Sequence, residues 1–179
     1  KQGWVEAPYA SIPYKLMQEA DNVKVRCSDD RLNVRILGGL RQDNPADVMR
    51  GEETQIRGFL SISSNFDGII CLPGTHTKWV HVSAGEVISF RTFMSGELFD
   101  LLSKYSVLKH SVKSDGWNDK EFKSAVSESI SNPQKIFSDF FKLRADHLLK
   151  QVGQSILRSK LSGYIIGAEL AGAKPYWLG

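Results

Sequence analysis

DGIICLPGTHTKWVHVSAGEVISFRTF, residues 67–93, is the stretch that decides the fold. Its apolar run ends at Pro73 and Gly74, and two segments of alternating apolar and polar residues follow at 78–82 and 86–93. Short bounded runs of this kind predict strands, and Ser-Ala-Gly at 83–85 predicts a β-hairpin with a glycine turn. We expect a buried strand, a polar loop and a hairpin.

The residues before this stretch predict two more strands and a helix. VKVRC at 23–27 alternates apolar and basic residues, and LNVRILGGL at 32–40 ends in two glycines, so both fit strands, with a turn at 41–48. From Ala46 to Ile62 apolar residues recur at three- and four-residue intervals, with Asp47 where a capping acid would sit. The polar stretch SSNFDG at 63–68 is expected to end that helix.

The residues after it are mostly helical in pattern, at 96–105, 119–130, 133–141 and 155–172. The chain is therefore strand-rich early and helix-rich late, which predicts an α/β fold. We place a domain boundary in the loop at 63–67, which divides the chain into residues 1–67 and 68–179.

Composition limits the class of protein. The chain has 179 residues, 41% of them hydrophobic and 24% charged, and a net charge of +3, so it can bury a core but has no run long enough to cross a bilayer. The charges are scattered, which fits a solvated surface and argues against nucleic-acid binding. Cys27 and Cys71 lie in apolar, β-rich contexts, which predicts buried free thiols. With no signal-peptide pattern, we expect a cytoplasmic protein.

Arg50, Gly51, Glu52 and Glu53 form the first candidate site. Gly51 allows close approach to the backbone, and a helix N-terminus offers unpaired N–H groups to an anion. A carboxylate at Glu52 could accept a hydroxyl proton, and Arg50 could pair with a carboxylate or phosphate. The alternative is that acids in a first helical turn only complement the helix dipole.

LPGTHTKW at 72–79 is the second candidate site. Backbone N–H groups, threonine hydroxyls and a lysine in one tight loop are typical of phosphate-binding turns. The stretch is not a P-loop, because G-x-x-x-x-G-K-[ST] is absent and a strand is expected to follow. The alternative is an ordinary turn joining two strands.

Other chemistries find little support in the sequence. No pair among His76, His81, His110 and His147 has the spacing of a helical zinc site, so we expect no protein-held metal. No G-x-S-x-G motif occurs, and neither cysteine lies in a loop beside a histidine. The aromatic residues are not interleaved with basic ones as in an RNA-binding platform.

Four motifs together resemble the 2-keto-3-deoxygalactonate kinase family: VMRGEETQ at 48–55, LPGTHTKWV at 72–80, FRTFMSGELFDLL at 90–102 and GYIIGAEL at 163–170. GWVEAPY at 3–9 matches the family's substrate-side loop. The resemblance covers essentially the whole chain. It implies an actin-like ATPase (ribonuclease H-like) fold of two α/β lobes, with the end of the first lobe in 1–67 and an incomplete second, nucleotide-side lobe in 68–179.

The resemblance also implies a function and its residues. The implied protein is a cytoplasmic kinase that uses Mg-ATP to phosphorylate the distal hydroxyl of a keto-deoxy sugar acid. Its expected partners are the sugar acid and ATP, with no nucleic acid and no membrane. The resemblance is also compatible with a protein that forms a homodimer. Glu52 is then the candidate base, with Asp47 and Glu53 as rivals. The residues expected to bind the substrate are Arg50, Glu53, Trp4 and Glu97. The residues expected to bind the ATP phosphates are Gly74, Thr75, His76 and Lys78.

The sequence departs from the family pattern at its ends. The family's D-x-G-(S/T) phosphate hairpin and its glycine-rich adenosine-binding segment do not occur in this sequence, so we expect this chain to be an incomplete enzyme by itself. The alternative function is a non-catalytic binding or regulatory module derived from a sugar kinase. No residue type distinguishes a galactonate from a gluconate substrate.

Overall fold

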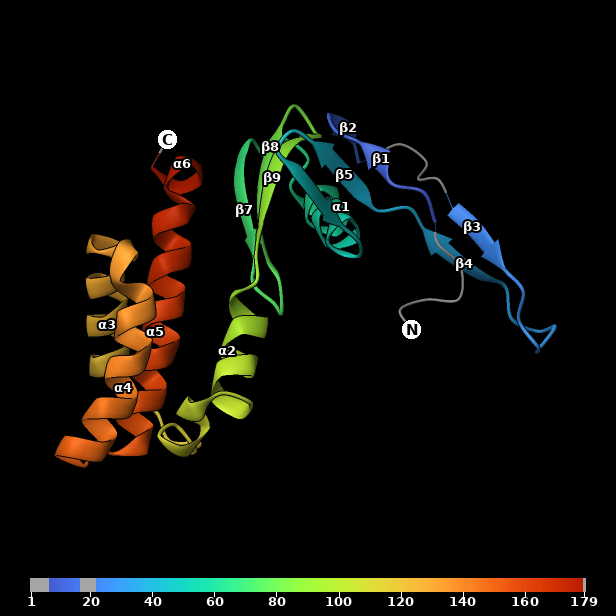
Figure 1. Ribbon diagram of the computed structural model, residues 1–179. Helices are drawn as coiled ribbons and strands as arrows, with labels where there is room; N and C mark the ends of the chain where they lie inside the picture. Colours follow the sequence, from blue (N-terminus) through green and yellow to red (C-terminus); the bar gives the residue numbers. More distant parts are fainter. Residues whose placement is uncertain (1–6, 17–21, 179) are drawn as a thin grey trace. The chain divides into compact units, whose positions relative to one another are not determined.

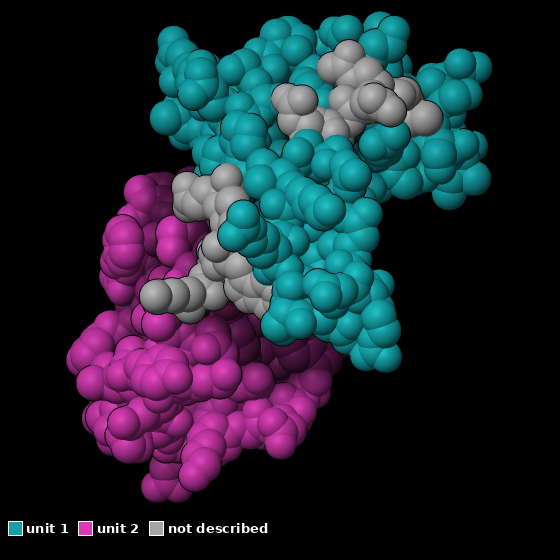
Figure 2. Space-filling view, turned by 90° about the vertical axis from the view of Figure 1, so that its right-hand side faces the viewer, with its two compact units in different colours: residues 1–72, 78–92 teal, residues 73–77, 93–179 magenta. Residues whose placement is uncertain are grey.

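The computed structural model describes residues 7–16 and 22–178, and the chain forms two compact units. Unit 1 comprises Lys1–Leu72 and Lys78–Thr92, and unit 2 comprises Pro73–Thr77 and Phe93–Gly179. Figure 2 colours the two units. Helices and sheets both contribute, so the predicted α/β class is confirmed in its coarse form (Figure 1).

Unit 1 contains the strands, arranged in three small sheets. β1 (Ala10–Ser11) pairs parallel with β5 (Leu40–Asp43), which pairs antiparallel with β6 (Ala46–Met49). A second sheet has the order β2 (Tyr14–Lys15), β9 (Glu86–Phe93), β8 (Thr77–Ser83) and β7 (Gly68–Leu72). β3 (Asn22–Val25) and β4 (Val34–Leu37) form a separate antiparallel pair.

The predicted hairpin is confirmed and is made by β8 and β9. Its two turn residues, Ala84 and Gly85, have φ angles of 51° and 76°, the left-handed conformations that match the twist of a tight hairpin. The Asp67 carboxylate accepts hydrogen bonds from the Ser83 hydroxyl at 2.6 Å and the Ala84 N–H at 3.4 Å. The Ser83 hydrogen bond holds the pKa of Asp67 below its usual value.

The helix predicted from Ala46 begins later. Ala46–Met49 is strand β6, which pairs back on β5 within the stretch expected to be a turn, and α1 spans Glu52–Ile62. Met49 is buried opposite Leu40 across the two strands, so its apolar side chain belongs to a sheet and not to the helical repeat. The expected helical cap at Asp47 is therefore wrong.

One face of α1 closes the core of unit 1. Ile56 and Leu60 of that helix pack with buried side chains of the sheets. The other buried members of this cluster are Leu16, Leu40, Met49, Val80, Val82, Val87 and Phe90. The alternating apolar residues of β8 and β9 thus supply much of the core, as their pattern predicts.

Unit 2 is helical beyond the 73–77 loop (Figure 1). Its helices are α2 (Ser95–Lys104), α3 (Asp119–Ser131), α4 (Ile136–Lys150), α5 (Gln154–Gly172) and α6 (Lys174–Trp177), with 3₁₀ turns at Val107–His110 and Pro133–Lys135. The four predicted helices are confirmed, although the one expected at 133–141 continues to Lys150. Leu108, Leu143, Leu157, Leu161 and Tyr164 are among its buried core residues.

α3 and α5 approach closely because two glycines of α5 face α3. A Cβ atom on Gly163 would lie 2.5 Å from the Phe122 carbonyl oxygen, and one on Gly167 would lie 2.5 Å from that of Val126. The Ser129 hydroxyl of α3 donates to the Tyr164 carbonyl at 2.8 Å. Any larger side chain at these positions would push the helices apart.

Two sequence expectations, on the burial of the cysteines and on the division of the chain, take a different form in the structure. Neither cysteine forms a disulfide, as expected, but Cys71 is exposed and Cys27 half-buried, so the expected burial was wrong. Strands β7, β8 and β9 belong to unit 1, so the two compact units do not match the expected division of the chain between residues 67 and 68. The assignment of these residues to the two lobes of a longer protein stays a prediction. Across residues 7–16 and 22–178, no helix is both long enough and apolar enough to span a membrane.

Candidate functional site

The first turn of α1 brings together three of the predicted site residues. Gly51 precedes the helix with φ of 104°, a conformation that glycine adopts without strain. Its N–H donates to Oε2 of Glu53 at 2.6 Å, and the Arg50 N–H donates to Oε2 of Glu52 at 3.0 Å. The two acids therefore fold back on the turn that precedes the helix and satisfy backbone N–H groups there.

Lys78 joins this turn from strand β8 of the same unit. Its ammonium lies 3.2 Å from Oε1 of Glu52, and the two side chains are only 5% and 22% exposed. Such a pair fixes the position of the Glu52 side chain. Lys78 is thus committed to Glu52, and its predicted role in phosphate binding stays a prediction.

Arg50 is held by two groups of unit 1. Its guanidinium donates to the Ala7 carbonyl at 2.7 Å and lies over the Tyr9 ring, 4.4 Å from the centroid. The sequence predicts a substrate clamp at this residue. These contacts instead favour a structural use of the guanidinium, which ties the N-terminal segment to the start of α1.

Asp47 lies on β6, and its carboxylate is saturated by hydrogen bonds. Oδ1 accepts from the Thr92 hydroxyl at 2.6 Å and from the Val48 N–H at 2.8 Å, and Oδ2 accepts from the Thr92 N–H at 2.8 Å. These bonds link β6 to β9. They favour a structural role for Asp47 over the role of a base, which stays an untested prediction.

The loop between β7 and β8 supplies the second candidate site, in unit 2. Nε2 of His76 lies 2.6 Å from Oε2 of Glu97, and the Glu97 N–H donates to the Thr75 carbonyl at 2.9 Å. A Cβ atom on Gly96 would lie 2.4 Å from the Gly74 carbonyl oxygen, so only glycine lets the loop rest on the start of α2. Glu97 thus contacts His76, and its predicted role as a substrate ligand stays a prediction.

A pocket of about 230 Å³ opens beside this loop within unit 2. The loop and the first turns of α2 form one wall, and residues of α5 form the other. The lining residues are Pro73, Gly74, Thr77, Ser95, Gly96, Phe99, Ser162, Ile165 and Ile166. A mostly apolar pocket whose lining also includes the hydroxyl residues Thr77, Ser95 and Ser162 suits an organic group that carries polar substituents.

The structure groups the predicted residues by unit. Asp47, Arg50, Glu52, Glu53 and Lys78 lie in unit 1, and Gly74, Thr75, His76 and Glu97 lie in unit 2. Trp4, predicted to contact substrate, lies outside the described residues. In the part of the chain that the structure describes, no group of three histidine, cysteine or acidic side chains could hold a metal ion.

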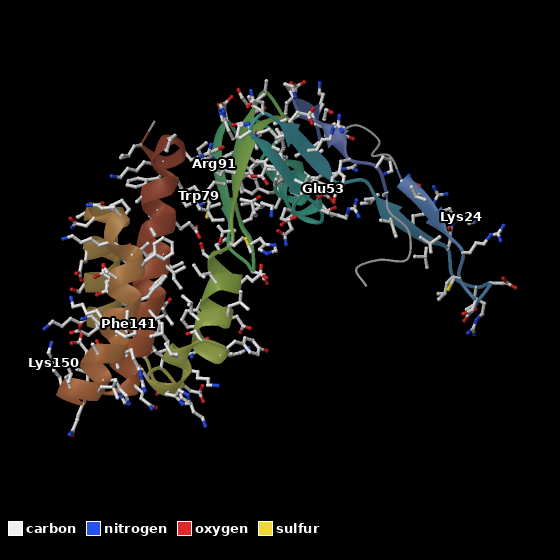
Figure 3. All side chains as sticks on the ribbon, viewed as in Figure 1. Lys24, Glu53, Trp79, Arg91, Phe141 and Lys150 are labelled. Carbon is white, nitrogen blue, oxygen red and sulfur yellow. The ribbon has the colours of Figure 1, made fainter. Side chains whose placement is uncertain are left out.

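Sequence reasoning missed a second pocket, which lies in unit 1 beside α1 and includes Arg57 and Tyr14. Figure 3 labels Glu53, another of its lining residues, on that helix. Arg57 is part of the ordinary polar face of an amphipathic helix in the sequence. Only its four-residue spacing from Glu53 could have drawn attention to it.

Comparison with known proteins identifies relatives over the whole chain. The family model described as 2-keto-3-deoxy-galactonokinase matches residues 1–179. The "Probable 2-dehydro-3-deoxygalactonokinase DgoK1" of Rhizobium meliloti (strain 1021) is 39% identical over 178 residues, and the 2-dehydro-3-deoxygalactonokinase of Escherichia coli (strain K12) is 32% identical over 176. Each alignment covers 97% of this chain and 58% of the relative, so the chain spans little more than half their length.

A solved structure agrees with these relatives. A crystal structure from Sinorhizobium meliloti, assigned to a 2-dehydro-3-deoxygalactonokinase protein, matches with a TM-score of 0.90 and 38% identity. The match covers 97% of this chain and 58% of that one. The fold of this chain is thus shared with that protein.

Proposed function

The chain belongs to the 2-keto-3-deoxy-galactonokinase family, and we propose that it is part of a kinase that transfers the terminal phosphoryl group of ATP to the distal hydroxyl of 2-keto-3-deoxygalactonate. The observation that carries this proposal is the family match over all of residues 1–179. The proposed fold of the whole protein is the two-lobed actin-like ATPase fold, and its proposed location is the cytoplasm.

Glu52 is the proposed base. In the reaction its carboxylate would accept the hydroxyl proton of the sugar acid while the new oxygen–phosphorus bond forms and the bond to the ADP oxygen breaks. The ion pair with Lys78 and the hydrogen bond from the Arg50 N–H support this assignment, because they hold the carboxylate in one position at the start of α1.

The loop at 73–77 is the proposed phosphate-binding element, and the pocket beside it would take the rest of the nucleotide. Nε2 of His76 lies 2.6 Å from Oε2 of Glu97, a contact that fixes the ring, and the other ring nitrogen would face a phosphate oxygen. Thr75 adds a hydroxyl donor. This donor set fits an anion, and Glu97 is proposed as a positioning residue.

Mg²⁺ would arrive bound to the ATP phosphates, where it neutralises their charge. Magnesium keeps several waters and needs few protein ligands, so it is compatible with a site built from phosphates. Chain residues then do the rest: they position the acceptor hydroxyl, remove its proton and hold the phosphates.

The test is a coupled assay of ADP formation by the full-length protein with 2-keto-3-deoxygalactonate and, separately, with its gluconate epimer. We expect turnover with at least the galactonate form, and a fall of about 100-fold or more in kcat for Glu52→Gln, in the range that general-base removal produces. Asp47→Asn serves as the rival variant. Unchanged turnover in Glu52→Gln would remove Glu52 from the mechanism, and absence of turnover with both acids would overturn the function.

A further inference from the structure

The second pocket lies wholly within unit 1, between α1 and the strands β2, β4 and β5. It has a volume of about 70 Å³. The residues that line it are Tyr14, Leu16, Leu37, Gly38, Leu40, Glu53, Thr54 and Arg57. Leucines and an aromatic ring thus form one part of the wall, and three polar side chains of α1 form the other.

Arg57 has no ion pair or hydrogen bond among the residues that the structure describes. Its natural partner on α1 would be Glu53, four residues earlier. Glu53 does not pair with Arg57: its Oε2 accepts from the Gly51 N–H and its Oε1 accepts from the Thr54 hydroxyl at 3.1 Å, which leaves each oxygen able to accept one further hydrogen bond. Among residues 7–16 and 22–178, this half-buried guanidinium at the pocket wall therefore has no partner for its donors.

Arg50 lacks this freedom, although the sequence marks it as the anion clamp. Its guanidinium is held by the Ala7 carbonyl and by the Tyr9 ring. A ligand could use Arg50 only by displacing these contacts. Arg57 needs no such rearrangement.

The polar groups of the pocket fit a hydroxy acid. A guanidinium pairs with a carboxylate through two parallel hydrogen bonds, and a carboxylate such as Glu53 accepts hydrogen bonds from hydroxyls. Glu53 would repel an anionic group placed beside it, so the pocket favours one orientation. The ligand's carboxylate lies at Arg57, and its hydroxyls lie toward Glu53.

We propose that this pocket binds the carboxylate end of the sugar acid and that Arg57 is the residue that pairs with the carboxylate. The inference rests on the proposed function for the identity of the acid. The volume of about 70 Å³ gives room for one end of such a molecule and not for all of it. Glu52, the proposed base, lies five residues before Arg57 on the same helix, about 7.5 Å along its axis.

Calorimetric titration of the full-length protein with two ligands tests the inference. One is 2-keto-3-deoxygalactonate, and the other is its primary amide, which keeps the skeleton and hydroxyls but carries no charge. The unaltered protein should bind the acid more tightly than the amide. Arg57→Gln should weaken acid binding by about 10- to 100-fold, the usual effect of losing hydrogen bonds to a charged group, and leave amide binding nearly unchanged.

Three variants make the result specific. Arg91→Gln removes another exposed arginine of unit 1, labelled on β9 in Figure 3, and should change neither affinity. Arg57→Lys keeps the charge without the two-pronged geometry and should lose less than Arg57→Gln. Arg50→Gln tests the rival clamp. Thermal unfolding of each variant shows whether it remains folded.

The outcomes separate the two proposals. If the protein phosphorylates the acid but Arg57→Gln and Arg57→Lys, both folded, keep the preference for acid over amide, the inference is overturned and the proposed function stands. A loss of that preference in Arg50→Gln alone also overturns it. If the unaltered protein neither binds nor phosphorylates the acid, both proposals fall.

Discussion

The pair formed by Lys78 and Glu52 makes a prediction at the scale of single residues. Both side chains are largely removed from water, and each depends on the other for its charge partner. Lys78→Met leaves the Glu52 carboxylate without that partner and should lower the free energy of unfolding by about 3 kcal/mol, as removal of one member of a buried pair does. Urea denaturation of the purified protein measures the change.

The matched control is the double variant Lys78→Met with Glu52→Gln. Because it removes both charges, it should recover much of the stability that the single variant loses. If the single and double variants are equally unstable, the loss comes from packing around Lys78 and not from an unpaired carboxylate.

Local rules found some site residues, and tertiary contacts decided the others. Gly51 and the two acids after it were predicted because a helix N-terminus has fixed chemical needs, and the sequence satisfies them within a few residues. The partner of Lys78 could not be predicted, because it is set by how β8 packs against α1. For the same reason, the sequence could not show that the Arg50 guanidinium lies over the Tyr9 ring. Nor could it show that Arg57 has no hydrogen bond or ion pair with any residue that the structure describes.

At the scale of elements, Asp67 makes the β8–β9 hairpin sensitive to acid. Its pKa is lowered in the folded protein, chiefly by the Ser83 hydroxyl, so it adds stability above the ordinary aspartate pKa of about 3.9 and loses it as pH falls further. Asp67→Asn should therefore be less stable than the unaltered protein at pH 6, and the difference should shrink below about pH 4. Urea midpoints between pH 6 and pH 3 measure it. A difference that stays constant with pH would show that ionisation of Asp67 is not involved.

The close contact of α3 with α5 gives a stability prediction that depends on packing and not on charged groups. Gly163→Ala places a methyl group against the Phe122 carbonyl and should cost about 1 to 3 kcal/mol, because the two helices must separate. Gly58→Ala is the control, since Gly58 lies within α1 and its added methyl group meets no atom. That variant should gain about 0.5 to 1 kcal/mol. Equal effects of the two substitutions in urea denaturation would contradict the close contact.

Elements were predicted well where one periodicity ran without interruption. The β8–β9 hairpin combines approximate alternation of apolar and polar residues with a positive-φ turn, and α5 has a long helical pattern, so both were recovered. The stretch from Ala46 to Ile62 was misread because Met49 and Ile56 happen to share helical spacing while they belong to different elements. The strand assignment of Ala46–Met49 depends on pairing with β5, which a local pattern does not contain.

At the scale of the whole molecule, the two units divide the proposed work. The residues proposed for the sugar acid and the base lie in unit 1, and the loop and pocket proposed for ATP lie in unit 2. The sequence predicted two parts but not that 73–77 would leave unit 1 and β8 would return to it. The unit to which a segment belongs depends on the hydrophobic core in which its apolar side chains pack. The alternating pattern of a strand does not distinguish the core of one unit from that of the other.

Hydrogen exchange of the full-length protein tests this division. The keto-deoxy acid should slow amide exchange in the first turns of α1, and ATP should slow it in the 73–77 loop and at the start of α2, because each ligand binds groups of its own unit. Adenosine, which lacks phosphates, should leave the loop's exchange unchanged, and the amide of the sugar acid should protect α1 less than the acid does.

A binding or regulatory module would respond to one ligand or to neither. Protection of both units, with these controls, would therefore favour the kinase over the module, whereas an unresponsive loop in the presence of ATP would remove the proposed phosphate site.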